Sequence, residues 1–386
     1  MKYEMTSSTF DASEKEVMLN VINSDMFTMG ENVKEFEGRF ANYFGRKYAA
    51  MVNSGSSANL IATASLFYRG ENRLKRGDEV IVPCLSWATT FYPLCQYGLR
   101  LKFVDIDLNT LNYDIDELKK AVGPETKMIV AVNILGNPCN FEEITRICDK
   151  NNIILFEDNC ESMGAKFNDV YTGTFGLIGT FSTFFSHHIS TIEGGIIVTD
   201  DFEVYSLCKS LRNHGWTRDQ EEGSMIYHKK DDDFFEAYRF ILPGYNVRPL
   251  ELQGAMGNVQ LNKLDNFLKI RRENAKHFVE LFKNDPRFII QKEVGNSSWF
   301  CFTMIVNPQS KFCRKKVLGV LNDAGIEHRI ITGGNFLRHD VIKYFDYQET
   351  KSSNTDIAHD NGFFVGNHPV DIRDKIDYLN ETLKKI

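Results

Sequence analysis

Two adjacent histidines, His187 and His188, lie in the segment FFSHHISTIEGG (residues 184–195), five residues ahead of a Glu-Gly-Gly turn. An imidazole has an ordinary pKa of about 6.5, so a histidine can both take and give a proton near neutral pH. A shared metal ion is the other chemistry that such a pair suggests. Successive side chains of a strand point to opposite faces, and no set of cysteines or acids supports a metal. The sequence therefore predicts proton transfer here and no metal site.

A second group of polar residues ends a buried apolar run, in the sequence IILFEDNCES of residues 153–162. Glu157 and Asp158 close the run, and Glu161 follows three residues later, a spacing that shares one face if a helical turn follows. An aspartate at the end of a buried strand can pair with a protonated ring nitrogen and so keep a heteroaromatic ring electron-accepting. Asp158 could equally cap the N-terminus of a helix.

Two further motifs follow predicted strands. The sequence NSGSSANL contains Gly55 and Ser56 at the start of a predicted helix, where a glycine permits close approach and free backbone amides suit a phosphate. An ordinary serine cap explains this motif as well. Trp87 follows the next strand, at the sheet edge where ligands of open α/β folds bind. Its indole could stack on a flat cofactor or serve only in packing.

The elements that must position these residues are predicted to alternate between helix and strand. Asp11 and Glu14 form a capping-box pattern for a first helix, and residues 33–44 predict a second. Continuous apolar runs predict strands, which favour a mainly parallel sheet covered on both faces. The predicted strands are residues 48–52, 79–82, 101–104, 128–132, 153–156, 180–184 and 195–199.

The pattern changes near residue 250, where a long helical pattern runs to about residue 282. Beyond it, residues 297–306 predict a strand, residues 311–325 a helix and residues 327–331 a strand, which together indicate a smaller α+β unit. We place a soft boundary between residues 250 and 265, so that residues 1–255 form a large domain and residues 256–386 hold the long helix and a small domain. Residues 218–240, rich in both charges, predict a solvated loop.

Composition narrows the classes of partner. The 386 residues carry a formal net charge of -7, which argues against a nucleic-acid or anionic-membrane surface and favours small molecules or other subunits. The eight cysteines show no CxxC spacing, no disulfide framework and no close Cys-x-Cys pair for an iron–sulfur cluster. No signal peptide or run of about 18 apolar residues is found, so we expect a cytoplasmic protein.

In order and spacing, these motifs resemble the DegT/DnrJ/EryC1/StrS sugar aminotransferases, a family of fold-type I pyridoxal phosphate enzymes. The segments GTFSTFFSHHISTIEGG and PGYNVRPLELQGAMG extend the resemblance over nearly the whole chain. It implies an α/β fold with a mostly parallel mixed sheet, a smaller C-terminal domain, and a homodimer with active sites at the subunit interface. For pyridoxal or pyridoxamine phosphate it implies a phosphate on Gly55 and Ser56, a ring against Trp87 with its nitrogen on Asp158, and further contacts from Glu161, Ser182 and Asn246, the last from the neighbouring subunit.

Two departures from the family pattern lie at the reacting face. Aligning Phe181-Ser182 and the Glu-Gly-Gly turn together places His187 where the family carries lysine, and Glu161 stands where its aminotransferases usually carry glutamine. A lysine amine binds the cofactor covalently and releases product, which an imidazole cannot do. His187 can still act as a base and then as an acid, a role worth about 100- to 10,000-fold in rate. His188 is then a packing neighbour.

For a member without the lysine, the resemblance implies an enzyme that removes the C3 hydroxyl from a nucleotide-linked 4-keto-6-deoxy sugar. It implies GDP as the nucleotide. L-glutamate supplies the amino group, 2-oxoglutarate and ammonia are released, and the product serves dideoxysugar (colitose, O-antigen) biosynthesis. Sugar-binding candidates are His214, Arg248 and Arg329, the arginines because their guanidinium forks match phosphate geometry. Two alternatives remain open: a nucleotide-sugar 4-aminotransferase, and a non-catalytic binder of the cofactor that acts as a regulator.

Overall fold

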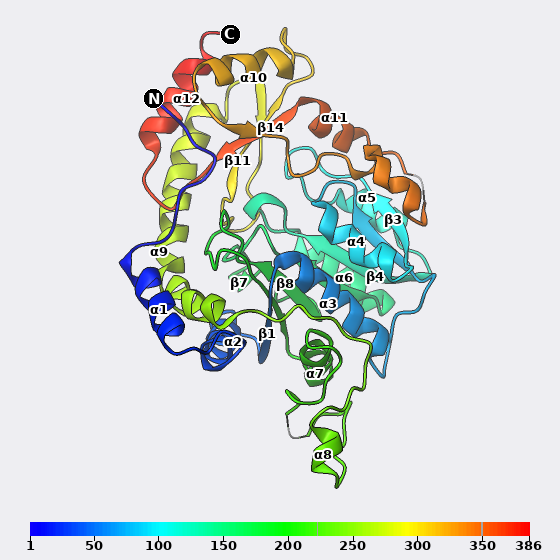
Figure 1. Ribbon diagram of the computed structural model, residues 1–386. Helices are drawn as coiled ribbons and strands as arrows, with labels where there is room; N and C mark the ends of the chain where they lie inside the picture. Colours follow the sequence, from blue (N-terminus) through cyan, green and yellow to red (C-terminus); the bar gives the residue numbers. More distant parts are fainter. Residues whose placement is uncertain (222, 349) are drawn as a thin grey trace.

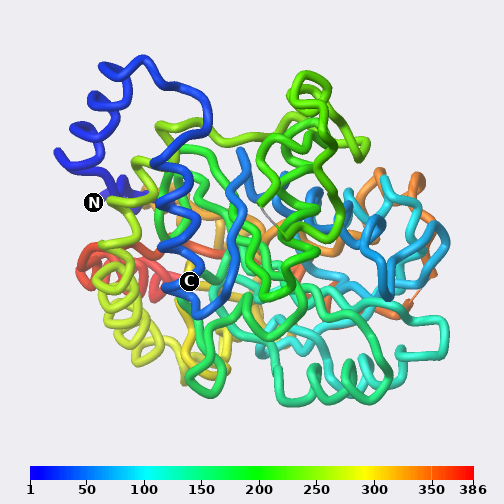
Figure 2. Tube along the Cα trace, turned by 90° about the horizontal axis from the view of Figure 1, so that it is seen from below, coloured from blue at the N-terminus to red at the C-terminus, as the bar shows by residue number. Residues whose placement is uncertain are grey.

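A computed structural model describes residues 1–221, 223–348 and 350–386 (Figure 1). A large sheet flanked by helices forms the body of the molecule, and the long helix α9 (Glu251–Phe282) rises along one side to a smaller C-terminal unit. Both termini lie near this smaller unit, and Figure 2 shows the red C-terminal helix beside the yellow-green turns of α9. Within the described ranges, none of the helices has the length and apolar character needed to span a bilayer.

Eight strands form the large sheet in the order β1-β9-β8-β5-β4-β2-β3-β13. Strand β9 runs antiparallel to both of its neighbours, and the other neighbouring pairs of this sheet are parallel, as expected for a buried α/β sheet. The strands are β1 (Tyr48–Val52), β2 (Glu79–Pro83), β3 (Arg100–Val104), β4 (Thr126–Val132), β5 (Ile154–Asp158), β8 (Ile178–Ser182), β9 (Gly195–Thr199) and β13 (Tyr347–Gln348). A two-stranded hairpin, β6 (Lys166–Phe167) and β7 (Val170–Tyr171), follows β5.

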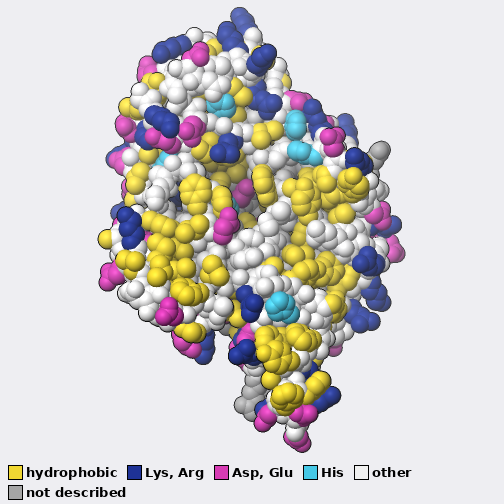
Figure 3. All heavy atoms as spheres, in the orientation of Figure 1, with side chains coloured by type: hydrophobic (Ala, Val, Ile, Leu, Met, Phe, Trp, Pro, Cys, Tyr) yellow, Lys and Arg dark blue, Asp and Glu magenta, His cyan; other side chains and the backbone are white. Residues whose placement is uncertain are grey.

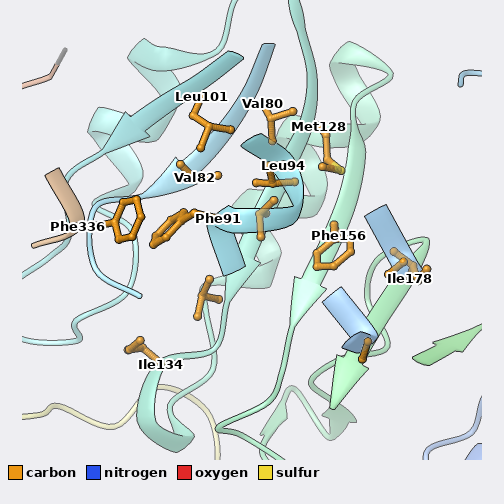
Figure 4. Close-up of a cluster of buried hydrophobic side chains, with 14 of the residues drawn as sticks. Val80, Val82, Phe91, Leu94, Leu101, Met128, Ile134, Phe156, Ile178 and Phe336 are labelled. Atoms are coloured by element: carbon orange, nitrogen blue, oxygen red, sulfur yellow. The ribbon is translucent and has the colours of Figure 1, made fainter. Parts of the chain in front are cut away.

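Helices cover both faces of this sheet. On one face lie α3 (Gly55–Tyr68), α4 (Ala88–Gln96) and α7 (Phe202–Leu211), whose apolar side chains meet those of the central strands in the largest core (Figure 4). On the other face lie α2 (Glu31–Tyr43), α5 (Ile115–Ala121), α6 (Phe141–Asn151) and the first half of α9. The short 3-10 turn η1 (Ile134–Gly136) contributes Ile134 and Leu135 to the largest core. Helix α1 (Ala12–Asn23) packs on α9 and starts with the predicted capping box of Asp11 and Glu14.

The smaller unit has a four-stranded sheet in the order β10-β11-β14-β12 and a core of its own. Its elements are β10 (Phe288–Ile290), β11 (Cys301–Val306), α10 (Arg314–Asp323), β12 (His328–Arg329), α11 (Ser353–Asn361), β14 (Gly362–Gly366) and α12 (Arg373–Leu383). The 3-10 turns η2 (Phe336–Arg338) and η3 (Asp340–Tyr344) lie between β12 and β13.

The predicted fold class is confirmed, and three differences between the elements and the predictions are larger than shifts of a few residues at an element's ends. The strand expected from residue 297 begins at Cys301, because Trp299 has a positive φ of 48° that no strand accommodates. Strand β13 joins the large sheet and Phe336 enters the large core (Figure 4), so part of the predicted small domain packs with the large one. Residues 218–240 contain a short helix, α8 (Asp233–Glu236), besides loop; Glu222 of this stretch lies outside the described residues. The division at residue 255 falls inside α9 and stays a prediction.

Candidate active site

A cavity of about 620 Å³ opens at the carboxyl ends of β2, β4, β5 and β8, where ligands of α/β sheets usually bind. Eight of the residues singled out from the sequence line it: Gly55, Ser56, Trp87, Asp158, Glu161, Ser182, His187 and Arg329. The sequence separates these residues by up to 274 positions. The large sheet brings seven of them to one edge, and β12 of the smaller sheet adds Arg329.

The turn at the start of α3 lets the backbone of Gly55 lie close to its neighbours and to a ligand in the cavity. Ser54 caps the helix by accepting a hydrogen bond from the Ser57 amide at 3.1 Å, so the cap is Ser54 and the predicted pair Gly55-Ser56 forms the first turn. A Cβ at Gly55 would lie 2.7 Å from the Ser182 Cβ and 3.1 Å from the Cys160 Sγ, so a glycine is required. The helix N-terminus faces the cavity with hydroxyls around it, an arrangement that fits a phosphate.

Asp158 is the last residue of β5 and 5% exposed. Its Oδ2 accepts hydrogen bonds from Asn59 Nδ2 at 2.8 Å and Thr90 Oγ1 at 2.7 Å, and its Oδ1 accepts one from the Cys160 amide at 3.2 Å. No helix follows β5 directly, so the helix-cap interpretation of Asp158 is wrong. Three donors hold the carboxylate in one orientation while it lines the cavity, which fits a ring nitrogen that carries a proton.

The two histidines lie in the turn between β8 and β9, because β8 ends at Ser182, two residues before the predicted strand does. Their side chains are therefore not directed to opposite faces by strand geometry, as predicted, but the two histidines have different contacts. His187 lines the cavity, and its Nδ1 lies 2.7 Å from the Cys160 carbonyl oxygen. His188 is fully buried behind it, with Nε2 3.2 Å from the Ser298 carbonyl oxygen. The structure gives the pair unequal environments.

The contact to Cys160 fixes how His187 can act. A carbonyl oxygen only accepts, so the Nδ1 atom carries the proton and donates, and the lone pair of a neutral imidazole is left on Nε2. Burial lowers the pKa of His187 to about 4, so the ring is neutral at physiological pH. A neutral ring with a free Nε2 is a proton acceptor.

Glu161 lines the same cavity, although the turn after β5 is not helical. Its Oε2 accepts a hydrogen bond from the Leu135 amide at 3.1 Å. Burial, with a further contribution from the negative charge of Asp158, raises the pKa of Glu161 to about 7. The carboxyl group can therefore exist in both protonation states near neutrality, which a glutamine at this place could not.

Trp87 borders the cavity from the loop before α4, and Arg329 borders it from β12 of the smaller unit. Trp87 precedes α4 and is 57% exposed, so its indole is not a core residue and the packing interpretation is wrong. Arg329 lies on β12 of the smaller unit and is also exposed. Both side chains are available to a ligand.

Three predicted residues do not line this cavity. His214 and Asn246 are exposed, and Arg248 is half-buried with its Nε donating to Asn246 Oδ1 at 3.0 Å. A backbone bridge joins Asn213 to Asn246, so the three residues lie on adjoining segments outside the chain's own site.

Sequence reasoning missed two residues that hold Asp158, namely Asn59 and Thr90. Asn59 comes one helical turn after Gly55, so the spacing could have placed it on the face that Gly55 turns to the cavity. Thr90 has no comparable signal, because only the tertiary fold brings α4 to the end of β5.

The model of the DegT/DnrJ/EryC1/StrS aminotransferase family matches residues 8–384. The chain belongs to this family. Among relatives, the GDP-4-keto-6-deoxy-D-mannose 3-dehydratase of Escherichia coli O55:H7 is 54% identical over 387 residues, covering 100% of both chains. The enzyme of the same name from Yersinia pseudotuberculosis is 50% identical over 388 residues, with 100% of this chain and 99% of the other covered.

Solved structures of DegT/DnrJ/EryC1/StrS relatives superpose closely. The E. coli GDP-4-keto-6-deoxy-D-mannose-3-dehydratase with bound hydrated PLP gives a TM-score of 0.98 at 54% identity, covering 99% of each chain. Structures of this dehydratase with a trapped PLP–glutamate geminal diamine, and of a histidine-to-asparagine variant with GDP-perosamine, each give 0.97 at 54% identity, covering 99% of this chain and 100% of the other. A variant with a histidine and the preceding serine replaced by lysine and asparagine gives 0.96 at 54% identity over 98% and 100%.

Proposed function

We propose that this chain is a pyridoxal/pyridoxamine phosphate-dependent dehydratase that removes the C3 hydroxyl of GDP-4-keto-6-deoxy-D-mannose. Glutamate supplies the amino group, and the products are GDP-4-keto-3,6-dideoxy-D-mannose, 2-oxoglutarate and ammonia. The sugar loses its C3 oxygen as water, and the keto oxygen of 2-oxoglutarate comes from water, so the oxygen atoms balance. The two electrons that reduce the sugar come from the oxidation of glutamate. The observation that carries the proposal is His187, a neutral imidazole that faces the cavity of an aminotransferase fold at the place where the family carries lysine.

The residues of the cavity divide into holding and reacting groups. Gly55, Ser56 and Ser182 would hold the cofactor phosphate, and the oriented carboxylate of Asp158 would hold the ring nitrogen. Bound there, the cofactor supplies an exchangeable amine and an electron-accepting ring. Among the described residues, the cavity lining contains no lysine, so these contacts and stacking on Trp87 would hold it without a covalent bond to the chain.

His187 would perform the proton transfers. In the first step His187 acts as the base, and its Nε2 accepts a proton. The hydrogen bond to the Cys160 carbonyl keeps the ring in a fixed orientation during this step. The resulting imidazolium then gives that proton to the departing C3 hydroxyl, which leaves as water. One residue thus serves as base and as acid, and the lowered pKa of His187 favours the second step because a weakly basic imidazole is a strong acid once protonated.

The solved relatives support His187 over His188 as the reacting residue. In the double variant, the altered histidine directly follows a serine. In this chain the Ser-His pair occurs at residues 186–187, and His188 follows a histidine. The order of residue types therefore matches the altered histidine with His187.

Incubating the purified protein with pyridoxal phosphate, glutamate and GDP-4-keto-6-deoxy-D-mannose tests the function. We expect ammonia, and a nucleotide sugar lighter by one oxygen in the mass spectrum. A 4-amino sugar that keeps its C3 oxygen would establish the aminotransferase instead. A protein that binds the cofactor and turns nothing over would be the regulator.

We further propose a cytoplasmic homodimer in which each subunit completes the other's site. Figure 3 shows apolar side chains gathered over one face of the molecule. The large apolar side chains that are exposed include Trp87, Phe184, Phe185, Ile192 and Leu250. Trp87 and Phe184 also line the cavity, so the apolar surface reaches its mouth. Burial of such a surface against a second copy would carry Asn246, His214 and Arg248 toward the partner's cavity.

Mixing two inactive variants tests this sharing. We expect His187→Asn and Asn246→Ala each to be inactive alone, because each lacks a different half of the site. After unfolding and refolding together, about half of the dimers are mixed and one of their two sites is intact, so about a quarter of wild-type activity should return. Refolding each variant alone is the control. Activity that stays at the single-variant level would place Asn246 outside a shared site.

A further inference from the structure

Arg271 is a buried arginine on α9 that the proposed reaction does not use. Its side chain is 3% exposed, and its Nη1 donates to the carbonyl oxygens of Phe300 at 3.1 Å and Asn367 at 2.8 Å. Its Nε is buried without a hydrogen-bond partner. Counting only described residues, no carboxylate lies within 4.0 Å of this guanidinium. A buried positive charge without an acid destabilises the folded state.

The contacts of Arg271 lead directly to the histidine pair. The Phe300 residue whose carbonyl it holds places its ring 5.1 Å from the His187 ring, edge to face, and 5.8 Å from the His188 ring. The Phe300 amide in turn donates to the Leu135 carbonyl at 3.2 Å, and the Leu135 amide donates to Glu161. A single short segment, backed by Arg271, therefore supports both His187 and Glu161.

The charges that face His187 come from several elements. Asp158 on β5 and Glu161 in the following turn are acidic, and Glu193 before β9 and Arg329 on β12 line the same cavity. Arg271 on α9 and the neighbouring His188 both contact Phe300, the residue whose ring packs on His187. Burial is the largest cause of the lowered pKa of His187, and the hydrogen bond to the Cys160 carbonyl opposes it. Of the charges, Arg271 lowers this pKa and Asp158 raises it. Burial lowers the pKa of Arg271 only to about 10, so it is charged at neutral pH.

We infer that Arg271 is the positioning residue of the acid–base histidine: by its hydrogen bond to the Phe300 carbonyl it holds the Phe300 ring against the His187 ring. Its charge acts in the same direction as burial, which is the largest cause of the lowered pKa of His187. The role of Arg271 in the reaction rests on the proposed function. Its influence on the position and the pKa of the His187 ring does not, and can be measured in the protein without substrate. The same charge would make the protonated ring a stronger acid toward the departing hydroxyl.

Histidine NMR titration of the cofactor-free protein tests the inference without any turnover. With ring-labelled histidine, and the His187 signal identified from its loss in His187→Asn, we expect wild-type His187 to titrate well below 6.5. Arg271→Gln keeps a donor for the two carbonyls and removes the charge, so its His187 should titrate at a higher pH than that of wild type. Arg271→Lys should stay near wild type. Where the holoenzyme is active, the acid limb of its rate–pH profile should move with the NMR value.

Arg272→Met is the matched control. Arg272, the next residue, is partly buried, and its Nε donates to the Ser297 carbonyl at 2.9 Å. It is not among the charges that change the pKa of His187. Its removal should leave the His187 titration unchanged. The inference is overturned if wild-type His187 titrates at 6.5, or if folded Arg271→Gln titrates like wild type. The first measurement needs no variant of Arg271. An inactive wild type with a low His187 pKa would contradict the proposed function and leave the role of Arg271 standing.

Discussion

The His187→Asn variant should lose about 100- to 10,000-fold in the rate of C3 deoxygenation while binding the cofactor almost as well as wild type. Asparagine can donate its side-chain amide to the Cys160 carbonyl as His187 does, so the turn should keep its shape. It has no group that takes a proton near neutral pH. The residues proposed to hold the cofactor are elsewhere, at the start of α3 and the end of β5. Single-turnover rates and equilibrium dialysis of pyridoxal phosphate measure the two quantities.

His188→Asn is the matched control, one residue away. His188 is fully buried against Ser298 and Phe300, so its replacement should lower the melting temperature. Its effect on the rate should stay within about tenfold, because it does not line the cavity. If His188→Asn is the variant that loses the chemistry, the assignment of roles within the pair is reversed.

The elements of the large sheet could be predicted because their signals are local. Apolar runs between turn residues located seven strands of the large sheet, and the capping box of Asp11 and Glu14 located α1. Strand β13 could not be found this way. It has two residues, and its place beside β3 depends on the packing of Phe336 and its neighbours in the large core.

In the candidate site, too, the residues with a local sequence signal could be predicted and the others could not. Residues with a chemical signature in a short motif, such as Asp158 and His187, were predicted and lie together. Residues that act through backbone contacts were not, because any side chain can offer a carbonyl or an amide. The Cys160 carbonyl, which sets the tautomer of His187, and the Leu135 amide, which binds Glu161, are of this kind. The unpaired state of Arg271 is likewise visible only after folding.

The Asp158→Asn variant should weaken cofactor binding by about 10- to 100-fold and reduce deoxygenation by more than that. A hydrogen bond to a charged group is worth about 1.5–3 kcal/mol, which corresponds to this range of affinity. Asparagine offers one oxygen instead of two, so it cannot accept from Asn59, Thr90 and Cys160 as the carboxylate does. Without the negative charge the ring nitrogen of the cofactor would lose its proton, and the ring would accept electrons poorly. Cofactor titration by absorbance and single-turnover rates measure both effects.

Thr90→Val separates the charge of Asp158 from its positioning. This change removes one neutral donor, at 2.7 Å from Oδ2, and leaves the carboxylate and the Asn59 bond in place. It should cost no more than about tenfold in cofactor affinity, the value of one ordinary hydrogen bond. Asp158→Asn should therefore be the weaker binder of the two. If it binds the cofactor as tightly as wild type, Asp158 does not pair with the ring nitrogen and its three donors serve only the fold. If Thr90→Val has the larger effect, the orientation of the carboxylate matters more than its charge.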